Sequence, residues 1–344
     1  MQGQTRRNTL RAMAATGAML MAGKGLAEGS EAIVETSGGR VRGVAEKGAL
    51  VFRGLRYAVA ERFMPPRPPQ PAAGITDASR FGASAPQSNA NPPPGPPYVI
   101  TAQLPRPANA PPPVKLPESE DCLFLNVWTP AVSGKLPVML WLHGGFFYGG
   151  SGSTTDGSRI AARGDAVVVS VNHRLNAFGY THLGDIAGAD FAHSGNVGML
   201  DIVAALQWVR ENIARFGGDP KRVMVFGTSG GGMKTSFLMA SPAARGMFHR
   251  AGVQSGPGLR FMERDAATAV TELLLIETGI ARANARDLAK LPMEKLLAGY
   301  HAVAAKLPPR RFIDLPCFAP VIDPQLLPQH PFSPKAAPGT RDIP

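Results

Sequence analysis

The chain has 344 residues, which suits one large domain or two ordinary ones. Hydrophobic residues make up 44% of the sequence and charged residues 18%, a balance that describes a globular protein with a sizeable core. The formal net charge is +11. The basic residues are scattered rather than gathered into a stripe, so the composition argues against nucleic acid as a partner.

The first segment of the chain, residues 1–27, has the pattern of an export signal. Arg6 and Arg7 form a twin-arginine pair, a moderately apolar stretch covers 12–23, and small residues follow at 25–27. This stretch is too short and too weakly apolar to remain as a membrane anchor. The sequence predicts a twin-arginine-type signal peptide over 1–27 and a periplasmic or secreted protein. The alternative is a disordered basic tail.

The segment that follows combines short strands with a long proline-rich stretch. Alternating apolar and polar residues predict antiparallel strands near 33–36, 40–43 and 50–52. Residues 62–117 are rich in proline, with eleven prolines between Pro92 and Pro117. Because proline donates no backbone hydrogen bond, this density excludes a regular helix or a central strand and predicts an extended loop.

From residue 123 onward, strands alternate with helices. Short apolar runs predict strands at 123–128, 138–142, 166–171, 223–226 and 252–254. Helical spacing of apolar residues predicts helices at 199–216, at 233–240 and over 262–303, with an interruption near Gly279. Strands that alternate with helices build a mostly parallel central sheet with helices on both faces, so the fold class is α/β.

A G-x-S-x-G pentapeptide covers residues 227–231, between a predicted strand and a predicted helix. At such a junction the motif is typical of the nucleophile elbow of an α/β-hydrolase. The tight turn would hold Ser229 in a strained conformation at the start of a helix, where the helix dipole favours a developing anion. In a chain with 39 glycines, the motif taken alone is equally compatible with a glycine-rich turn.

A second glycine-rich motif, residues 143–150 (HGGFFYGG), follows the strand predicted at 138–142. We call this segment the HGG loop. An HGG-type turn in this place supplies backbone N–H groups to an oxyanion hole, and the N–H of Gly230 completes the hole. The two motifs occur in the expected order, each behind a strand, which favours a catalytic site over a chance turn.

With these motifs, the chain resembles the type B carboxylesterases, the group that includes the cholinesterases, from about residue 33 to residue 344. Further segments carry the resemblance, at 120–127, 171–175, 195–198, 216–220, 248–251 and 254–256. The resemblance implies an α/β-hydrolase fold and hydrolysis of a small-molecule ester. It assigns Ser229 as the nucleophile and Gly145, Phe146 and Gly230 as oxyanion donors. No metal-ligand spacing, phosphate loop or dinucleotide fingerprint occurs, so no cofactor or metal is expected.

The resemblance also assigns structural roles. His143 begins the HGG loop and is not expected to be the catalytic base. Arg62 and Glu120 stand where the family forms a buried ion pair. Ala85 stands where the family has the disulfide partner of Cys122, so we expect a free thiol at Cys122.

Two departures from the family fall in the site itself. Thr228 stands where the family has glutamate, and Phe146 stands where it has glycine or alanine. The backbone N–H survives at Phe146, but the ring must find space beside the acyl pocket. We therefore expect a restriction to short acyl groups.

The catalytic acid and base raise a further question. In the family they follow the nucleophile in the order acid, then histidine, and this sequence ends after the segment 320–323 that precedes the acid. We expect a domain over 28–344 that is incomplete at its C-terminus and turns over little or no ester. His249, His301 and His330 are not expected to replace the base.

Two alternatives stay open at this point. One is a non-catalytic binding protein that resembles the adhesion proteins sharing this fold. The other is a fragment completed by a missing C-terminal segment. The sequence leaves the identity of the ester and the oligomeric state undetermined.

Overall fold

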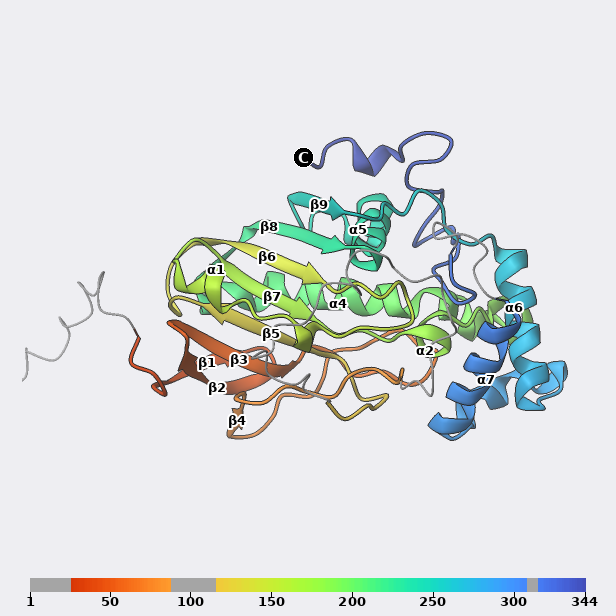
Figure 1. Cartoon of the computed structure of the whole chain (residues 1–344), viewed down its shortest axis with the longest axis horizontal. Helices are drawn as coiled ribbons and strands as arrows, with labels where there is room; N and C mark the ends of the chain where they lie inside the picture. Colours follow the sequence, from red (N-terminus) through yellow and green to blue (C-terminus); the bar gives the residue numbers. More distant parts are fainter. Residues whose placement is uncertain (1–25, 88–115, 308–314) are drawn as a thin grey trace, which may run out of the picture.

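The structure is a computed structural model that describes residues 26–87, 116–307 and 315–344. A nine-stranded sheet forms its centre, in the order β1-β2-β3-β5-β7-β6-β8-β9, with β4 paired to β2 (Figure 1). The strands are β1 (Glu31–Thr36), β2 (Gly39–Glu46), β3 (Ala49–Arg56), β4 (Ile75–Asp77), β5 (Phe124–Thr129), β6 (Leu136–Leu142), β7 (Val167–Val171), β8 (Gly218–Thr228) and β9 (Arg250–Gln254).

The helices are α1 (Ser158–Ala162), α2 (Asn176–Tyr180), α3 (Gly184–Ala187), α4 (Val197–Asn212), α5 (Gly230–Ala240), α6 (Arg264–Thr278) and α7 (Met293–Lys306). Short 3₁₀ turns connect them: η1 (Gly152–Thr154), η2 (Ala189–Phe191), η3 (Ser194–Asn196), η4 (Ile213–Phe216), η5 (Pro242–Ala244), η6 (Arg282–Lys290) and η7 (Pro338–Thr340). In the described part of the chain, no helix is both long and apolar enough to cross a membrane.

The sheet is mixed, and its two halves follow from how the strands are connected. Strands β1, β2, β3, β5 and β7 pair antiparallel in that order, while β7, β6, β8 and β9 pair parallel. Parallel neighbours need a crossover helix, and α4 and α5 precede β8 and β9 in the chain. The mostly parallel sheet predicted from the sequence therefore describes the half that carries the glycine-rich motifs.

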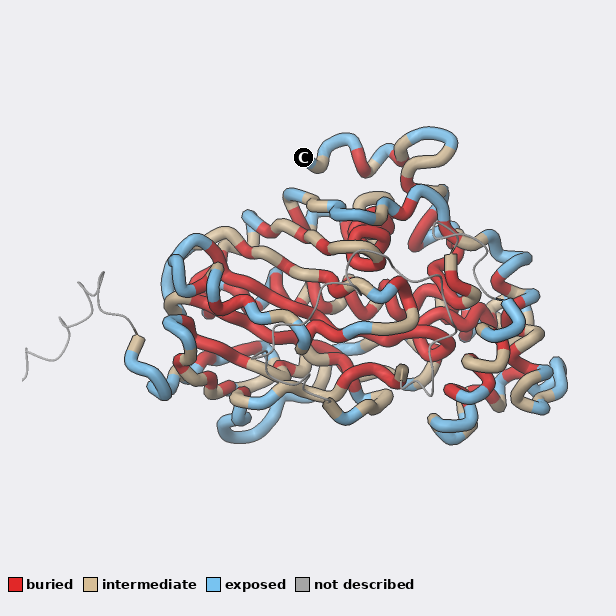
Figure 2. The backbone as a smooth tube through the Cα atoms, in the orientation of Figure 1, coloured by how far each residue is buried: buried red, intermediate tan, exposed pale blue. Residues whose placement is uncertain are grey.

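Helices cover both faces of the sheet, as expected. On one face, α1 packs over a small cluster formed by Ala49, Val51, Trp128, Ala161 and Val168. The large core cluster lies with α4 and α5 and includes Phe216, Val225 and Phe237. All five residues of β7 are buried, as expected for a strand covered on both faces. Figure 2 shows this burial concentrated in the central strands and in α5.

Helices α6 and α7 pack against each other beyond the end of the sheet (Figure 1), as the sequence predicted for 262–303. The interruption is at Gly279, whose φ of 70° ends α6 in the left-handed conformation. After α7 the chain returns over α5, and the N–H of Ala251 on β9 donates to the carbonyl of Pro344 at 3.0 Å. The last residues therefore lie beside β9.

Two ion pairs hold loops to this framework. Arg62 pairs with Glu120 as predicted (Nε to Oε2 2.8 Å), and its guanidinium also donates to the carbonyls of Leu288 and Leu291. The Arg62 side chain is buried, whereas that of Glu120 is 33% exposed. A pair that the sequence analysis did not single out, Arg174 with Asp201, is buried on both sides (4% and 0% exposed).

The free thiol expected at Cys122 is confirmed. Cys122 is buried and forms no disulfide, and Cys317 is also free. Burial raises the pKa of both thiols, to about 12 for Cys317, so both are protonated at neutral pH. The signal predicted for 1–27 lies almost entirely outside the described residues. Of the proline-rich loop, the structure describes 62–87 and 116–117, where the three-residue β4 is the one named helix or strand.

Candidate active site

Ser229 occupies a strained turn between β8 and α5. Its φ of 58° and ψ of −122° lie in a region that non-glycine residues rarely adopt. The turn is fixed from β9, because the Ser229 N–H donates to the carbonyl of Gln254 at 2.8 Å and the Thr228 hydroxyl donates to the Gln254 side chain at 2.8 Å. This is the strand-to-helix elbow that the pentapeptide predicted, with the Ser229 side chain at the carboxyl end of the strand.

The flanking glycines are required because α5 begins against the end of β6. A Cβ at Gly231 would lie 2.1 Å from the carbonyl oxygen of Leu142, and one at Gly227 would lie 2.6 Å from the same oxygen. No side chain fits at either distance. The spacing of glycines around Ser229 is therefore set by this close approach of backbones.

The HGG loop lies directly against the elbow. A Cβ at Gly230 would lie 2.3 Å from the backbone nitrogen of Phe146, and a Cβ at Gly144 would lie 3.7 Å from Cβ of Ser229. The structure thus brings together the two motifs, which are separated by about eighty residues of sequence. The predicted site residues Gly145, Phe146, Ser229 and Gly230 belong to this one junction.

The backbone carbonyls inside the loop are each held by a donor. Nδ1 of His143 lies 2.8 Å from the carbonyl oxygen of Gly144, so this ring nitrogen carries the proton. The carbonyl of Gly145 accepts from the N–H groups of Tyr148 (3.2 Å) and Gly149 (3.0 Å). Because a trans peptide points its N–H opposite to its C=O, the N–H groups that follow these two carbonyls point away from their acceptors.

Those two N–H groups belong to Gly145 and Phe146. In the described part of the chain, the N–H of Gly145 has no hydrogen-bond acceptor. Gly230 is the first residue of α5, so its N–H lacks an intrahelical acceptor as well. Backbone donors at a helix N-terminus favour an anion.

The Phe146 ring is buried at this junction rather than exposed to solvent. Its backbone has a φ of 49°, and its side chain is 8% exposed. The ring stacks on Tyr148 with centroids 5.7 Å apart and an interplanar angle of 18°. The loop therefore accommodates the bulky residue by taking a left-handed backbone conformation at Phe146 and burying its ring.

The structure adds a residue that the sequence analysis missed. Lys234, on α5, is fully buried, and its Nζ donates to the carbonyls of His143 (3.0 Å) and Phe146 (2.7 Å). The ammonium also lies 5.6 Å from the centre of the Phe147 ring. Burial lowers the pKa of Lys234 from 10.5 to about 7. Lys234 is the one charged residue of α5, and this could have singled it out in the sequence.

Two buried imidazoles line the inner side of the loop. The rings of His143 and His173 stack with centroids 4.9 Å apart. Burial, and then the charge of Lys234, lower the pKa of His143 to about 3, and the same two causes lower that of His173 well below its usual value. Both rings are therefore neutral at physiological pH. This agrees with a structural role for His143.

No histidine reaches Ser229, although all seven histidines lie in the described residues. His249 hydrogen-bonds to the backbone of Val223 in the middle of β8, six residues before Ser229 and therefore roughly 20 Å away. His330 is bonded to Glu263 (3.0 Å), and His301 lies on α7. In the described part of the chain, the Ser229 hydroxyl has no hydrogen-bond partner.

Asp323 likewise has other partners. Its carboxylate lies 3.2 Å from Nδ1 of His193 and accepts from the N–H groups of Gln325 (2.8 Å) and Leu326 (2.9 Å). In the described residues, no hydrogen bond or ion pair joins Asp323 to His330. The two residues therefore form no acid–base pair.

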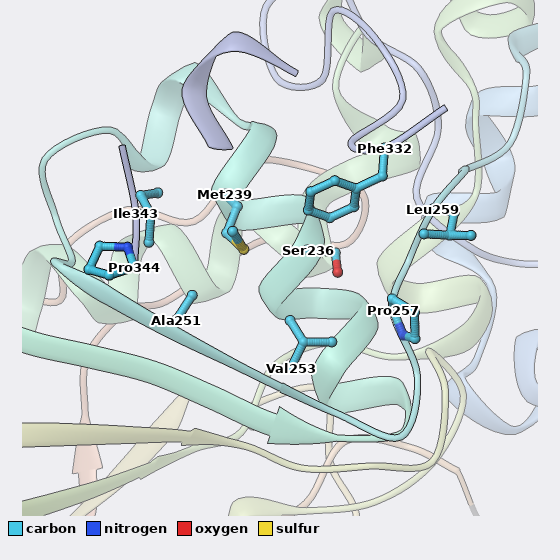
Figure 3. Close-up of a pocket in the computed structure, with 9 residues that line it drawn as sticks. All are labelled: Ser236, Met239, Ala251, Val253, Pro257, Leu259, Phe332, Ile343 and Pro344. Carbon is cyan, nitrogen blue, oxygen red and sulfur yellow. The ribbon is translucent and has the colours of Figure 1, made fainter. Parts of the chain in front are cut away.

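An apolar pocket of about 450 Å³ lies on another side of α5 (Figure 3). Side chains from α5, β9 and the C-terminal residues line it, among them Met239, Val253 and Ile343. Ser229 is not among the lining residues, so this pocket and the candidate active site are different places.

Comparisons with known proteins place this chain in a family. The model of the carboxylesterase family matches residues 30–340. The para-nitrobenzyl esterase of Bacillus subtilis (strain 168) is 38% identical over 309 residues, which cover 87% of this chain and 58% of that protein. The phenmedipham hydrolase of Pseudarthrobacter oxydans is 36% identical, with 87% and 57% covered. Neuroligin-2 of Mus musculus is 33% identical, with 87% and 38% covered.

Solved structures give the same picture. A carboxylesterase of Geobacillus stearothermophilus, EST55 at pH 6.2, superposes with a TM-score of 0.75 at 38% identity, over 91% of this chain and 60% of that one. A structure titled PNB esterase gives a TM-score of 0.78 at 36% identity, over 92% and 62%. The chain therefore spans about six tenths of the length of these relatives.

Proposed function

The chain belongs to the carboxylesterase family, and from this premise we propose that it acts on carboxylic esters through an acyl-enzyme on Ser229. The observation that carries the proposal is the junction of the two motifs. A strained serine at the carboxyl end of a strand lies against the HGG loop, and the backbone nitrogen of Phe146 lies next to Gly230. A glycine-rich turn without a catalytic role would not need this close approach.

In the proposed mechanism, the Ser229 hydroxyl oxygen attacks the ester carbonyl carbon. The carbonyl oxygen becomes an oxyanion that accepts from the N–H groups of Gly145, Phe146 and Gly230. One such donor contributes about 10²- to 10³-fold in rate. The alcohol leaves with a proton, and attack by water then releases the acid and restores the serine hydroxyl.

The base that accepts the serine proton is the part of the mechanism that the described residues do not supply. None of the seven histidines contacts Ser229, and a serine hydroxyl is a weak nucleophile without a base. We therefore propose that this chain reacts faster with activated acyl and phosphonyl reagents, whose leaving groups depart without needing a proton, than with ordinary esters, which it turns over slowly.

The proposed substrate is a small-molecule ester with a short acyl group. The buried Phe146 ring takes up volume beside the oxyanion donors, which leaves less room for a long acyl chain. The names of two relatives, para-nitrobenzyl esterase and phenmedipham hydrolase, are consistent with small substrates. We also propose that residues 1–27 direct export and that 28–344 form the hydrolase domain, so the site would face the periplasm or the exterior.

A second candidate is a non-catalytic binding protein. It is favoured by the Ser229 hydroxyl, which has no base within the described residues, and by the similarity to neuroligin-2. The geometry of the elbow and the HGG loop argues for the esterase. The two candidates differ in whether Ser229 reacts covalently.

A fluorophosphonate probe distinguishes them. The purified chain, Ser229→Ala and Ser255→Ala are each treated with the probe, and the adduct is located by intact mass and peptide mapping. Ser255 is a matched control because it is exposed, has a φ of 49° and follows the neighbouring strand β9. We expect one adduct that persists in Ser255→Ala and is lost in Ser229→Ala. A folded chain that acquires no adduct on Ser229 would support the binding protein instead.

A further inference from the structure

The mechanism above does not use Lys234. We propose that Lys234 is a positioning residue of the oxyanion hole, which holds the HGG loop in its donor-presenting form and places a positive charge behind the developing oxyanion. The inference rests on the proposed function of Ser229. It extends that function by adding an ionisable residue to a site otherwise built from backbone groups.

The first support is where the two hydrogen bonds fall. Lys234 binds the carbonyls of His143 and Phe146, the first and last residues of the segment that supplies two of the proposed donors. The two carbonyls between them are held by other groups of the loop. All four consecutive carbonyls are thus fixed, and Lys234 alone ties both ends of the segment to one atom.

The second support is the connection to the nucleophile. Lys234 lies on α5 about one and a half helical turns after Ser229, and its side chain reaches the HGG loop from that helix. The same rigid element therefore carries the nucleophile, the N–H of Gly230 and the group that anchors the other donors. A shift of α5 relative to the loop would break both bonds to Nζ.

The third support is the charge itself. A buried ammonium without a carboxylate partner is unfavourable, and in the described residues the hydrogen bonds of Lys234 go to two backbone carbonyls and none goes to an acidic side chain. The titratable groups that face it are His143 and His173, which stay neutral at physiological pH. An uncompensated cation in a low-dielectric site favours an anion nearby, and the oxyanion is the anion this site would form.

One alternative role is that of general base for Ser229. A base must lie within hydrogen-bonding distance of the serine hydroxyl, whereas both hydrogen bonds of Nζ go to carbonyl oxygens of the HGG loop and none joins it to the Ser229 hydroxyl. The two roles have opposite pH dependences near pH 7, where burial places the pKa of Lys234. The cationic form favours the oxyanion, so its advantage falls as pH rises. A base would instead become more effective as pH rises.

The test measures the rate of fluorophosphonate labelling of Ser229 in the full chain between pH 6 and pH 8.5. Lys234→Met removes the charge and both hydrogen bonds at similar volume. Lys234→Arg keeps a permanent charge and donors. Lys290→Met is the matched control, since Lys290 is an exposed lysine whose side chain is 80% accessible. Circular dichroism and thermal unfolding report whether each variant is folded.

We expect Lys234→Met to label at least about tenfold more slowly than the unmodified chain at pH 6, in line with the loss of oxyanion stabilisation. Lys234→Arg should label faster than Lys234→Met, and Lys290→Met should match the unmodified chain. The ratio of the unmodified rate to the Lys234→Met rate should fall severalfold by pH 8.5. Using this ratio cancels the pH dependence of the probe and of the serine.

Three results would overturn the inference. The rates of the unmodified chain and Lys234→Met could agree at every pH, or their ratio could rise with pH as for a base. If Lys234→Met does not fold, the labelling rate of the unmodified chain is compared with that of Lys234→Arg, because arginine stays charged at every pH tested. A ratio of these two rates that does not change with pH would reject the proposed role of the Lys234 charge. A chain that labels poorly at Ser229 in every form, control included, rejects the proposed function instead.

Discussion

Replacing Lys234 with methionine should change how the stability of the protein depends on pH. The folded-state pKa of Lys234 is lowered by burial to about 7 from 10.5, so below pH 7 folding forces an ammonium into the core. At 1.36 kcal/mol per pKa unit, this costs about 5 kcal/mol of stability at low pH. The penalty is present in full below the folded-state pKa. It diminishes as pH rises from 7 toward 10.5, because the folded lysine releases its proton while the unfolded one keeps it.

The comparison of the two proteins at two pH values isolates this charge. Methionine also leaves two carbonyls without a donor, but that cost of about 1–3 kcal/mol each does not depend on pH. Between pH 6 and pH 8.5, the unmodified chain should therefore gain about 2 kcal/mol relative to Lys234→Met. Urea unfolding of both proteins at each pH measures the difference. An unchanged difference between the two pH values would mean that Lys234 is not a buried cation, and the reasoning on its charge would be refuted.

The remaining predictions concern the loop, the elbow and the thiols. Phe146→Gly should raise the rate of acylation by p-nitrophenyl octanoate roughly tenfold relative to the rate with p-nitrophenyl acetate. The rate is measured as p-nitrophenol released in the first acylation, and an unchanged preference would show that the ring does not limit acyl length. Gly231→Ala should destabilise the protein by at least about 2 kcal/mol in urea unfolding, because its Cβ would lie 2.1 Å from a carbonyl oxygen of β6. Gly38→Ala is the control and should cost little, because its Cβ would lie 3.7 Å from the nearest atom. Equal losses of stability in the two variants would contradict this packing. Cys122 and Cys317 should resist a thiol reagent in the folded protein, with two thiols per chain appearing on denaturation; fewer than two would indicate a disulfide.

The part of the site that follows from local backbone constraint was predictable from the sequence. The glycines around Ser229 and in the HGG loop report where two backbones touch, and those contacts are now seen at Leu142 and Phe146. Each motif directly follows a predicted strand, so the sequence alone places both motifs at the carboxyl ends of strands. The strand order then brings them together, because β6 and β8 are parallel neighbours.

The role of Lys234 could not be predicted in the same way. A lysine on a helix is usually solvated, and its burial here depends on which carbonyls the HGG loop turns inward, about ninety residues earlier in the chain. The Arg174–Asp201 ion pair was not predicted for the same reason, since it joins residues 27 positions apart whose contact depends on tertiary packing. Sequence patterns report local periodicity and motifs, whereas these polar contacts depend on the assembled fold.

The mixed sheet illustrates the same limit at the level of topology. The strand at β5 was expected to open the alternating part of the chain, and it does form where predicted. It pairs antiparallel with β3 and β7, however. The short connection from β5 to β6 reverses the chain, and β7 runs parallel to β6, so β7 lies antiparallel to β5. An apolar run predicts a strand but carries no information on its neighbour.

The central claim is that Ser229 is a nucleophile served by three backbone donors, and a crystal structure of the phosphonylated chain tests it most directly. We expect the phosphorus on the Ser229 hydroxyl oxygen and one phosphonyl oxygen at about 2.7–3.1 Å from the backbone nitrogens of Gly145, Phe146 and Gly230. A phosphonyl oxygen that points to solvent, or an adduct on another residue, would contradict the account.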